Sequence, residues 1–189
     1  MRLYCATTNP GKLREFIDIV GDVVPVPDLA RIAPPPETGS TFEENASQKA
    51  AYYSRFCDGL LFADDSGIEV DALGGAPGIY SARFAGEGAT DERNNTLLLA
   101  RMRSVTNRAA RFVCAVAVAD RGRVLKTFRG SVEGQLLEEP RGNNGFGYDP
   151  LFYYPPFGCS FGEISAERKK QVSHRGHALR AMRAWLETR

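Results

Sequence analysis

The chain has 189 residues, with 43% hydrophobic and 25% charged residues, and its 24 basic and 23 acidic residues leave a formal net charge of +1. This length fits one domain over residues 1–189, or two lobes that share one sheet. The balanced charge excludes a global attraction to nucleic acid or to a membrane surface. The first residues are too short and too polar a run for a signal peptide, and no stretch of about 18 apolar residues predicts a membrane span. We therefore expect a cytoplasmic protein without nucleic-acid or membrane partners.

The first third of the chain alternates short apolar runs with helical patterns. Apolar residues recur from Leu13 to Val20 at the i, i+3, i+4, i+7 spacing of an amphipathic helix. Thr41 and Glu44 have the spacing of a capping box, which predicts that a helix begins there. The predicted elements are strands over 3–6 and 23–26, a helix over 12–20, a proline-rich loop over 33–41 and a helix from about 42 to 55.

The rest of the chain predicts a sheet with an antiparallel hairpin. A buried strand over 60–63 is expected to stop at Asp64, and 68–73 reads as a second extended piece. Two β-rich runs flank the Asp120–Arg123 turn, which is typical of a long hairpin. Further expected elements are a helix from about 91 to 103, hairpin strands over 111–119 and 124–132, a Gly/Asn-rich loop over 141–150 and a helix over 174–186. This mixture predicts an α/β fold.

The first candidate site is the loop between the first strand and the first helix. A loop that enters a helix presents free backbone N–H groups and the positive end of the helix dipole, which suit a polyphosphate. The spacing is not that of a Walker A loop, and a plain helix cap with a surface lysine is the alternative interpretation. The candidate residues are Thr7, Thr8, Asn9, Pro10, Gly11 and Lys12.

Carboxylates at two places could bind a metal ion. Glu37 follows three prolines that restrict its backbone, and Mg²⁺ prefers one or two protein carboxylates together with substrate phosphates. Asp64 and Asp65 end an apolar strand, where two carboxylates are costly unless a metal or a cation compensates them. One of these two carboxylates is therefore a candidate to hold a metal ion or to accept a proton from an attacking water. The alternatives are solvated or capping carboxylates and a simple Asx-turn.

Three further segments add polar or aromatic groups. The glycine-rich turn from Gly74 ends in Arg83, which could neutralise a phosphate. Phe146, between two glycines, could stack on a base. Structural turns, a buried aromatic corner and solvated basic residues are the alternatives. The remaining candidates are Lys49 on the second helix, Ser66, Gly147, Tyr148 and Asp149, and the group Lys169, His174 and Arg175 near the last helix.

The set of motifs, in this order, resembles the inosine triphosphate pyrophosphatase family, the XTP/dITP diphosphatases. The resemblance spans nearly the whole chain. The matching pieces are Thr7-x-Asn9-x-x-Lys12, Glu37-x-Gly39-x-Thr41-Phe42-x-Glu44-Asn45-Ala46, Ala63-Asp64-Asp65-Ser66-Gly67, the run Gly74-Gly75-Ala76-Pro77-Gly78-Ile79-Tyr80-Ser81-Ala82-Arg83, Phe146-Gly147-Tyr148-Asp149-Pro150 and Ser173-His174-Arg175-Gly176.

The resemblance implies an activity, a fold and roles for individual residues. Such enzymes hydrolyse ITP, dITP or XTP to the monophosphate and pyrophosphate, use Mg²⁺ and are homodimers with an elongated mixed sheet and two lobes around a groove. By resemblance, residues 7–12 hold the triphosphate, and Glu37 and Asp65 bind the metal while Asp65 accepts the proton of the attacking water. Ser66 contacts the substrate, residues 146–149 hold the base, and Lys169, His174 and Arg175 complete the pocket.

The sequence departs from the family pattern at two positions, and two other functions stay open. Thr8 stands where the family has glycine, and Pro36 stands where a second carboxylate is common. One alternative is a pyrophosphatase that prefers modified pyrimidine nucleotides or dUTP. The other is a nucleotide-binding module without catalysis. For a purine substrate, His174 or Arg175 is expected to donate to the 6-carbonyl that inosine and xanthosine carry and adenine lacks.

Overall fold

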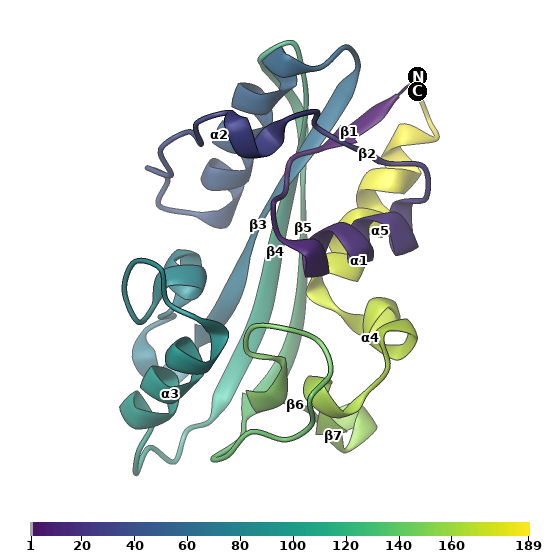
Figure 1. Cartoon of the computed structure of the whole chain (residues 1–189). Helices are drawn as coiled ribbons and strands as arrows, with labels where there is room; N and C mark the ends of the chain where they lie inside the picture. Colours follow the sequence, from purple (N-terminus) through teal and green to yellow (C-terminus); the bar gives the residue numbers. More distant parts are fainter. Residues whose placement is uncertain (1) are drawn as a thin grey trace. The chain divides into compact units, whose positions relative to one another are not determined.

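The computed structural model describes residues 2–189, and its framework is a seven-stranded mixed sheet with helices packed on it (Figure 1). The strand order is β2-β1-β3-β4-β5-β6-β7. β1 is parallel to β2 and to β3, whereas β6 is antiparallel to β5 and to β7. The strands are β1 (Leu3–Cys5), β2 (Val24–Pro25), β3 (Leu60–Val70), β4 (Ala109–Asp120), β5 (Arg123–Leu136), β6 (Phe152–Tyr154) and β7 (Cys159–Ser160). The predicted α/β class is confirmed.

The chain divides into two compact units, and β3, β4 and β5 each contribute residues to both. The first unit comprises the chain up to Asp65, Cys114–Gly130 and His174–Arg189. The second comprises Ser66–Val113 and Ser131–Ser173. The boundary on β3 falls between Asp65 and Ser66, inside the motif that the sequence analysis singled out.

Three helices cover the strands of the first unit: α1 (Pro10–Val20), α2 (Phe42–Tyr53) and α5 (His174–Leu186). α1 and α5 lie side by side on one face of the strands, and α2 lies on the other (Figure 1). The apolar stripe predicted for the first helix packs α1 on the sheet. Its residue Phe16 is fully buried, with its ring centroid 5.0 Å from that of Phe62 on β3. Leu179 and Met182 of α5 join the same core.

The second unit holds α3 (Asp91–Arg101) and α4 (Ala166–Val172) together with several short 3₁₀ turns. Its core is built around three aromatic rings. The ring of Phe152 lies with its centroid 4.5 Å from that of Phe112 and 5.0 Å from that of Phe161. Leu98 of α3 is fully buried in this core, which fixes the helix on the unit.

Strand β3 corrects one prediction, because it does not stop at Asp64 but continues to Val70. The sequence Asp64-Asp65-Ser66-Gly67 is therefore extended backbone and not a turn. The two carboxylates are tolerated because lysines from distant segments pair with them, as described below. Gly67 is needed because the Ser81 side chain packs directly against its backbone, and not because the chain turns there. A Cβ at this position would lie 2.3 Å from the Ser81 Oγ.

The hairpin prediction is confirmed and extended. β4 and β5 are joined by Arg121 and Gly122, whose φ angles of 48° and 86° fit a type I′ turn. β4 begins two residues before and ends one residue after its predicted bounds, and β5 begins one residue before and ends four residues after them. The short elements β6, β7 and α4 were not predicted, and Lys169, expected near the last helix, lies on α4 just before that helix.

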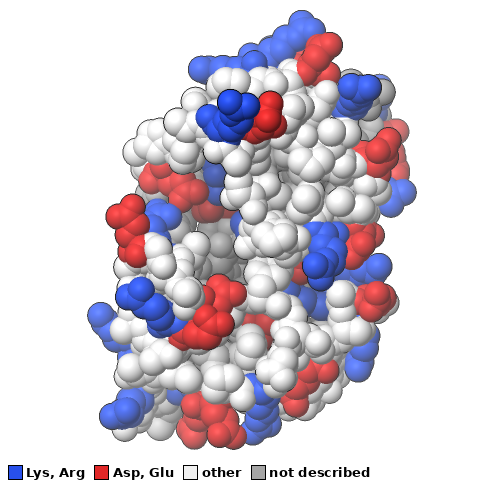
Figure 2. Space-filling model, viewed as in Figure 1, with Lys and Arg blue, Asp and Glu red and all other residues white. Residues whose placement is uncertain are grey.

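Basic and acidic side chains are interspersed over the visible face of the molecule (Figure 2). This distribution agrees with the near-zero formal charge of +1. Among residues 2–189, no helix combines the length and the apolar character that a membrane crossing requires.

Candidate active site

The loop from Thr7 to Asn9 leads into α1, as predicted, but the helix begins at Pro10, two residues before the predicted start. Asn9 caps this helix, since its Oδ1 accepts a hydrogen bond from the Lys12 backbone N–H at 3.0 Å. The Thr7 Oγ1 accepts another from the Asn9 N–H at 3.2 Å. Pro10 occupies the first turn, where the missing N–H costs nothing. Thr8, Asn9 and Pro10 are exposed, so this helix end is accessible to an anion.

Asp64 and Asp65 point to opposite faces of β3, because successive side chains of a strand alternate. Asp64 meets side chains of α1 and α5, whereas Asp65 meets side chains of α2. Both are buried, at 3% and 8% exposure. The alternation therefore gives the two adjacent carboxylates separate environments.

Asp64 lies at the centre of a buried network of charges. Its Oδ1 accepts from the Lys12 Nζ at 3.0 Å and its Oδ2 from the Arg175 Nε at 3.2 Å. Arg175 also pairs with Glu15 of α1 through Nη1, and the Cys114 Sγ lies 3.8 Å from the Asp64 Oδ2. Burial alone would raise the pKa of Asp64, but Lys12 and Arg175 hold it well below its usual range. Asp64 is therefore a fixed anion.

Asp65 is paired with Lys49, and the pair lies close to Glu37. The Lys49 Nζ donates to the Asp65 Oδ1 at 2.8 Å and to the Glu37 Oε1 at 3.2 Å. The Asn45 Nδ2, one turn earlier on α2, donates to the Asp65 Oδ2 at 3.3 Å. Burial raises the pKa of Asp65 above its usual value, although Lys49 opposes this. Asp65 therefore gains proton affinity where Asp64 loses it.

The same two carboxylates are the candidate metal ligands. Glu37 and Asp65 both pair with one positive charge, the Lys49 ammonium. Burial alone would lower the pKa of Lys49, but the nearby carboxylates of Asp65 and Asp64 raise it above the usual value. Within residues 2–189 no three His, Cys, Asp or Glu side chains cluster closely enough to form a cage of protein ligands alone. A pair of carboxylates fits Mg²⁺, which takes its remaining ligands from phosphates and water.

In the second unit, Ser66 and Arg83 are both partly exposed. Arg83 ends a 3₁₀ turn, Gly78–Arg83, and its guanidinium carbon lies 5.3 Å from the ring centroid of Tyr80. The turn is tied to β3 because the Ser81 Oγ accepts from the Ile68 N–H at 2.9 Å and donates to the Gly78 carbonyl at 2.6 Å. The sequence motif therefore builds a rigid corner beside Ser66.

The segment from Gly145 to Asp149 is a compact loop folded around the Asp149 carboxylate. The Asp149 Oδ2 accepts from the Phe146 N–H at 2.9 Å and from the Lys169 Nζ at 2.6 Å, and Asp149 is 1% exposed. The Lys169 Nζ also lies 4.6 Å from the centroid of the half-buried Phe146 ring. The Tyr148 hydroxyl donates to the Ser81 carbonyl at 2.7 Å. The structure thus brings Phe146, Asp149 and Lys169 together, as the resemblance implies.

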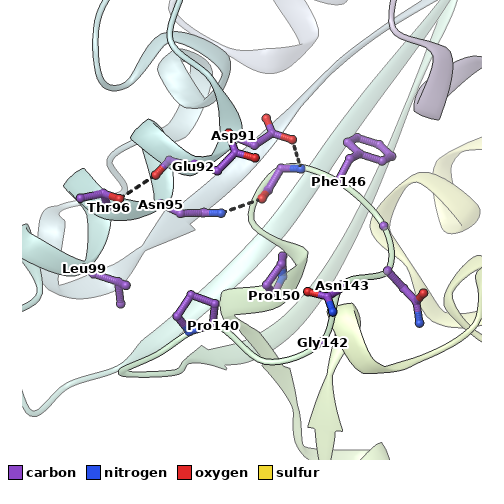
Figure 3. A pocket seen from close by; sticks show the side chains of 13 residues that line it. Asp91, Glu92, Asn95, Thr96, Leu99, Pro140, Gly142, Asn143, Phe146 and Pro150 are labelled. Atoms are coloured by element: carbon purple, nitrogen blue, oxygen red, sulfur yellow. Dashed lines mark hydrogen bonds between the residues drawn. The ribbon is translucent and has the colours of Figure 1, made fainter.

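A pocket of about 390 Å³ lies between this loop and α3 (Figure 3). Two side chains of α3 reach the loop there. The Asp91 Oδ2 accepts from the Gly147 N–H at 2.6 Å, and the Asn95 Nδ2 donates to the Gly147 carbonyl at 3.0 Å. Neither residue was predicted as part of the site, although their i, i+4 spacing on a predicted helix indicates that they share a face.

Two candidate residues are more deeply buried than the sequence indicated. His174 and Arg175 begin α5 at 4% and 2% exposure. Arg175 pairs with Asp64 and with Glu15, both of the first unit. Glu15 and Cys114, the other members of that network, carried no sequence signal beyond lying on a helix and in an apolar strand. The contact of Arg175 with a base stays a prediction.

Comparisons with known proteins agree with this architecture. The sequence matches the Ham1 family over residues 3–185. It is 48% identical to a dITP/XTP pyrophosphatase of Acidobacterium capsulatum, with 98% of each chain covered. The structure is similar to that of the Staphylococcus aureus Ham1 protein, with a TM-score of 0.89, 41% identity and coverage of 100% and 99% of the two chains. It is also similar to a HAM1 protein from Coxiella burnetii, with a TM-score of 0.90, 34% identity and full coverage of both chains.

Proposed function

This chain belongs to the Ham1 family, and we propose that it hydrolyses the non-standard purine nucleotides ITP, dITP and XTP to the monophosphate and pyrophosphate. Such an enzyme removes deaminated purines from the nucleotide pool. The names of full-length relatives support the substrate class. The observation that carries the proposal is the meeting of Asp65, Lys49 and Glu37, because it combines a carboxylate of raised pKa with a cation and a second carboxylate.

The triphosphate is assigned to the N-terminus of α1 and the nearby lysines. Thr8, Asn9 and Pro10 are exposed at the N-terminus of α1, where the helix dipole favours anions. Lys12 is held by Asp64, and Lys49 is held by Asp65 and Glu37. We assign to Lys12, Lys49 and Arg83 the neutralisation of the charge that builds on the phosphates. Thr7, Thr8, Asn9, Pro10 and Gly11 are assigned to substrate binding with them, as is Ser66.

Mg²⁺ is the proposed cofactor, with Glu37 and Asp65 as its protein ligands. Two carboxylates that converge on one cation fit this ion, which takes phosphate oxygens as further ligands. When bound, the ion would supply Lewis-acid stabilisation of the phosphate oxygens. Pro36 in place of a second carboxylate leaves Glu37 to serve this loop alone.

Asp65 is the proposed proton acceptor. Its raised pKa increases its affinity for the proton of a water that attacks the α-phosphorus, after which pyrophosphate leaves. Asn45 and Lys49 orient the carboxylate from the same side. Asp64 is held as a permanent anion by Lys12 and Arg175, so its role is to position Lys12 instead of transferring protons.

The base is assigned to the loop of the second unit. Phe146 presents a half-buried ring beside Lys169, and Gly147, Tyr148 and Asp149 complete the loop. His174 and Arg175 are proposed to donate to the 6-carbonyl. For Arg175 the ion pairs with Asp64 and Glu15 favour a second role, in which it holds Asp64 in place. We also propose that the protein is cytoplasmic and forms a homodimer, as the family resemblance implies. Light scattering of the purified protein would test the dimer, because it measures whether the mass in solution is that of one chain or of two.

A substrate panel tests the function. We expect pyrophosphate release from ITP, dITP and XTP in the presence of Mg²⁺, much slower release from ATP and dUTP, and loss of all release with EDTA. Preference for dUTP would favour the pyrimidine alternative. Binding of ITP without turnover would favour a non-catalytic module. Asp65→Asn should lower kcat by orders of magnitude while ITP still binds, and near wild-type hydrolysis by this variant would contradict the assignment.

A further inference from the structure

Gly147 is held at both of its backbone hydrogen-bonding groups by two side chains of one helix. Asp91 accepts from its N–H at 2.6 Å, and Asn95 donates to its carbonyl at 3.0 Å (Figure 3). Asp91 and Asn95 lie one turn apart on α3, so they project from the same face. The short contact to Asp91 joins an N–H to a carboxylate, a pairing that is stronger than a neutral hydrogen bond. We refer to Asp91, Asn95 and Gly147 as the glycine clamp.

Helix α3 is itself firmly fixed on the second unit. Thr90 caps it by accepting from the Arg93 N–H at 3.3 Å. The Asn94 Oδ1 accepts from the Ala85 N–H at 2.8 Å, and its Nδ2 donates to the Ala82 carbonyl at 3.2 Å. Leu98 is fully buried in the core. The clamp therefore connects Gly147 to a rigid support.

Gly147, the clamped residue, directly follows Phe146, whose ring the proposed function stacks on the base. Gly145 and Gly147, on either side of Phe146, have φ angles of +76° and +63°, in the left-handed region that glycine enters most easily. Asp149 and Lys169 hold this loop from one side. The clamp ties the two peptide groups on either side of the Gly147 Cα to α3 from another side and so limits how far the Phe146 ring can shift.

The Asn95 side chain is committed to this contact. It is 9% exposed, and its Nδ2 donates to Gly147, while no group among residues 2–189 donates a hydrogen bond to its buried Oδ1. Rotating the amide would place its oxygen against the Gly147 carbonyl, so the observed orientation is the one that satisfies Gly147. The hydrogen bond that the Asn95 side chain makes to the protein is therefore the one to Gly147.

We propose that Asp91 and Asn95 are positioning residues that set the discrimination between nucleobases by fixing Gly147, and with it the Phe146 ring. This inference rests on the proposed function, in which Phe146 stacks on the base. Base selection depends on donors and acceptors that are held in place, since a shift of about 1 Å at such a site is enough to lower activity strongly. Loss of the clamp should weaken binding of the preferred base without removing the groups that react.

The test compares Asp91→Ala and Asp91→Asn with the control Glu92→Ala. Glu92 lies in the same first turn of α3 and lines the same pocket, and removing it takes away an equal charge from the helix N-terminus. We expect Asp91→Ala to accelerate amide exchange of Gly147, measured by NMR on the free protein, by about tenfold, which corresponds to about 1.4 kcal/mol. Glu92→Ala should leave that exchange rate unchanged. Asp91→Asn, which keeps an acceptor, should recover most of the protection.

Kinetics supply the second readout. Asp91→Ala and Asn95→Ala should raise KM for ITP by about three- to tenfold, the loss of one hydrogen bond, with kcat within about twofold. The ratio of kcat/KM for ITP to that for ATP should fall. Equal Gly147 exchange in Asp91→Ala and Glu92→Ala, or an unchanged ITP-to-ATP ratio, would overturn the proposal. If the wild-type protein releases no pyrophosphate from ITP, the proposed function fails. Accelerated Gly147 exchange would then leave the clamp standing and overturn only its role in base discrimination.

Discussion

Replacing Asp64 by asparagine should mainly affect stability, whereas replacing Asp65 by asparagine should mainly affect activity. The two residues are neighbours on β3 and both are buried, so the substitutions are closely matched. The surroundings of Asp64 favour its charge and those of Asp65 disfavour it, as the opposite directions of their pKa shifts indicate. Asp64→Asn should therefore destabilise the fold, and Asp65→Asn should mainly abolish turnover.

The size of the Asp64 effect follows from what the substitution leaves behind. The Arg175 side chain is 2% exposed and would keep Glu15 as a partner, while Lys12 would face a neutral amide. Removing one member of a buried ion pair costs about 3–5 kcal/mol, and the remaining partner places Asp64→Asn near the lower end, at about 3 kcal/mol. For Asp65→Asn the change should stay within about 1 kcal/mol, because Lys49 keeps Glu37 at 3.2 Å.

Urea unfolding monitored by tryptophan fluorescence measures both values. Trp185 is the single tryptophan and packs on Phe128 in the first unit, with ring centroids 5.6 Å apart. Because the pKa of Asp64 is lower in the folded protein than in the unfolded chain, its stabilisation is present above a pH of about 4 and is lost as the pH falls toward the folded value. The deficit of Asp64→Asn should shrink accordingly in acid. Equal stabilities of the two variants, or a less stable Asp65→Asn, would refute the reasoning.

Three further predictions concern the base loop, the strand and the thiols. Phe146→Ala should raise KM for ITP by about tenfold in steady-state kinetics, because stacking on a base contributes about 1–3 kcal/mol, and an unchanged KM would exclude the stacking role. Gly67→Ala would place a Cβ 2.3 Å from the Ser81 Oγ, so thermal unfolding should show a loss of about 1–3 kcal/mol, and a wild-type Tm would contradict the close approach. Cys5 and Cys114 are fully buried, and burial raises the pKa of Cys5 to about 12 and that of Cys114 well above its usual value. Thiol titration should therefore label only the other two cysteines before unfolding, and rapid labelling of all four would be inconsistent with this core.

The sequence predicts those elements whose patterns are local and long. The apolar spacing of α1, the cap at Thr41 and the β4–β5 hairpin all follow from neighbours within a few residues. The short strands β6 and β7 and the seven-residue helix α4 escape prediction because so few residues carry too weak a periodicity. Their positions depend on packing around Phe152 and Phe161, which involves residues far apart in the sequence.

The candidate site was harder to predict where distant charges decide the local structure. The sequence indicated that Asp64 and Asp65 need compensation but not that it comes from α1, α2 and α5 separately. This compensation keeps β3 extended through a motif that otherwise resembles a turn. The alternation of side chains along the strand then assigns the two carboxylates different partners, which was predictable only once the strand was known to continue.

The most direct test of the proposed reaction is the position of bond cleavage. When ITP is hydrolysed with Mg²⁺ in water labelled with ¹⁸O, attack of water on the α-phosphorus places the label in the monophosphate. Mass spectrometry of the products should therefore find ¹⁸O in IMP and none in the pyrophosphate. Label in the pyrophosphate, or release of IDP and inorganic phosphate, would contradict the account.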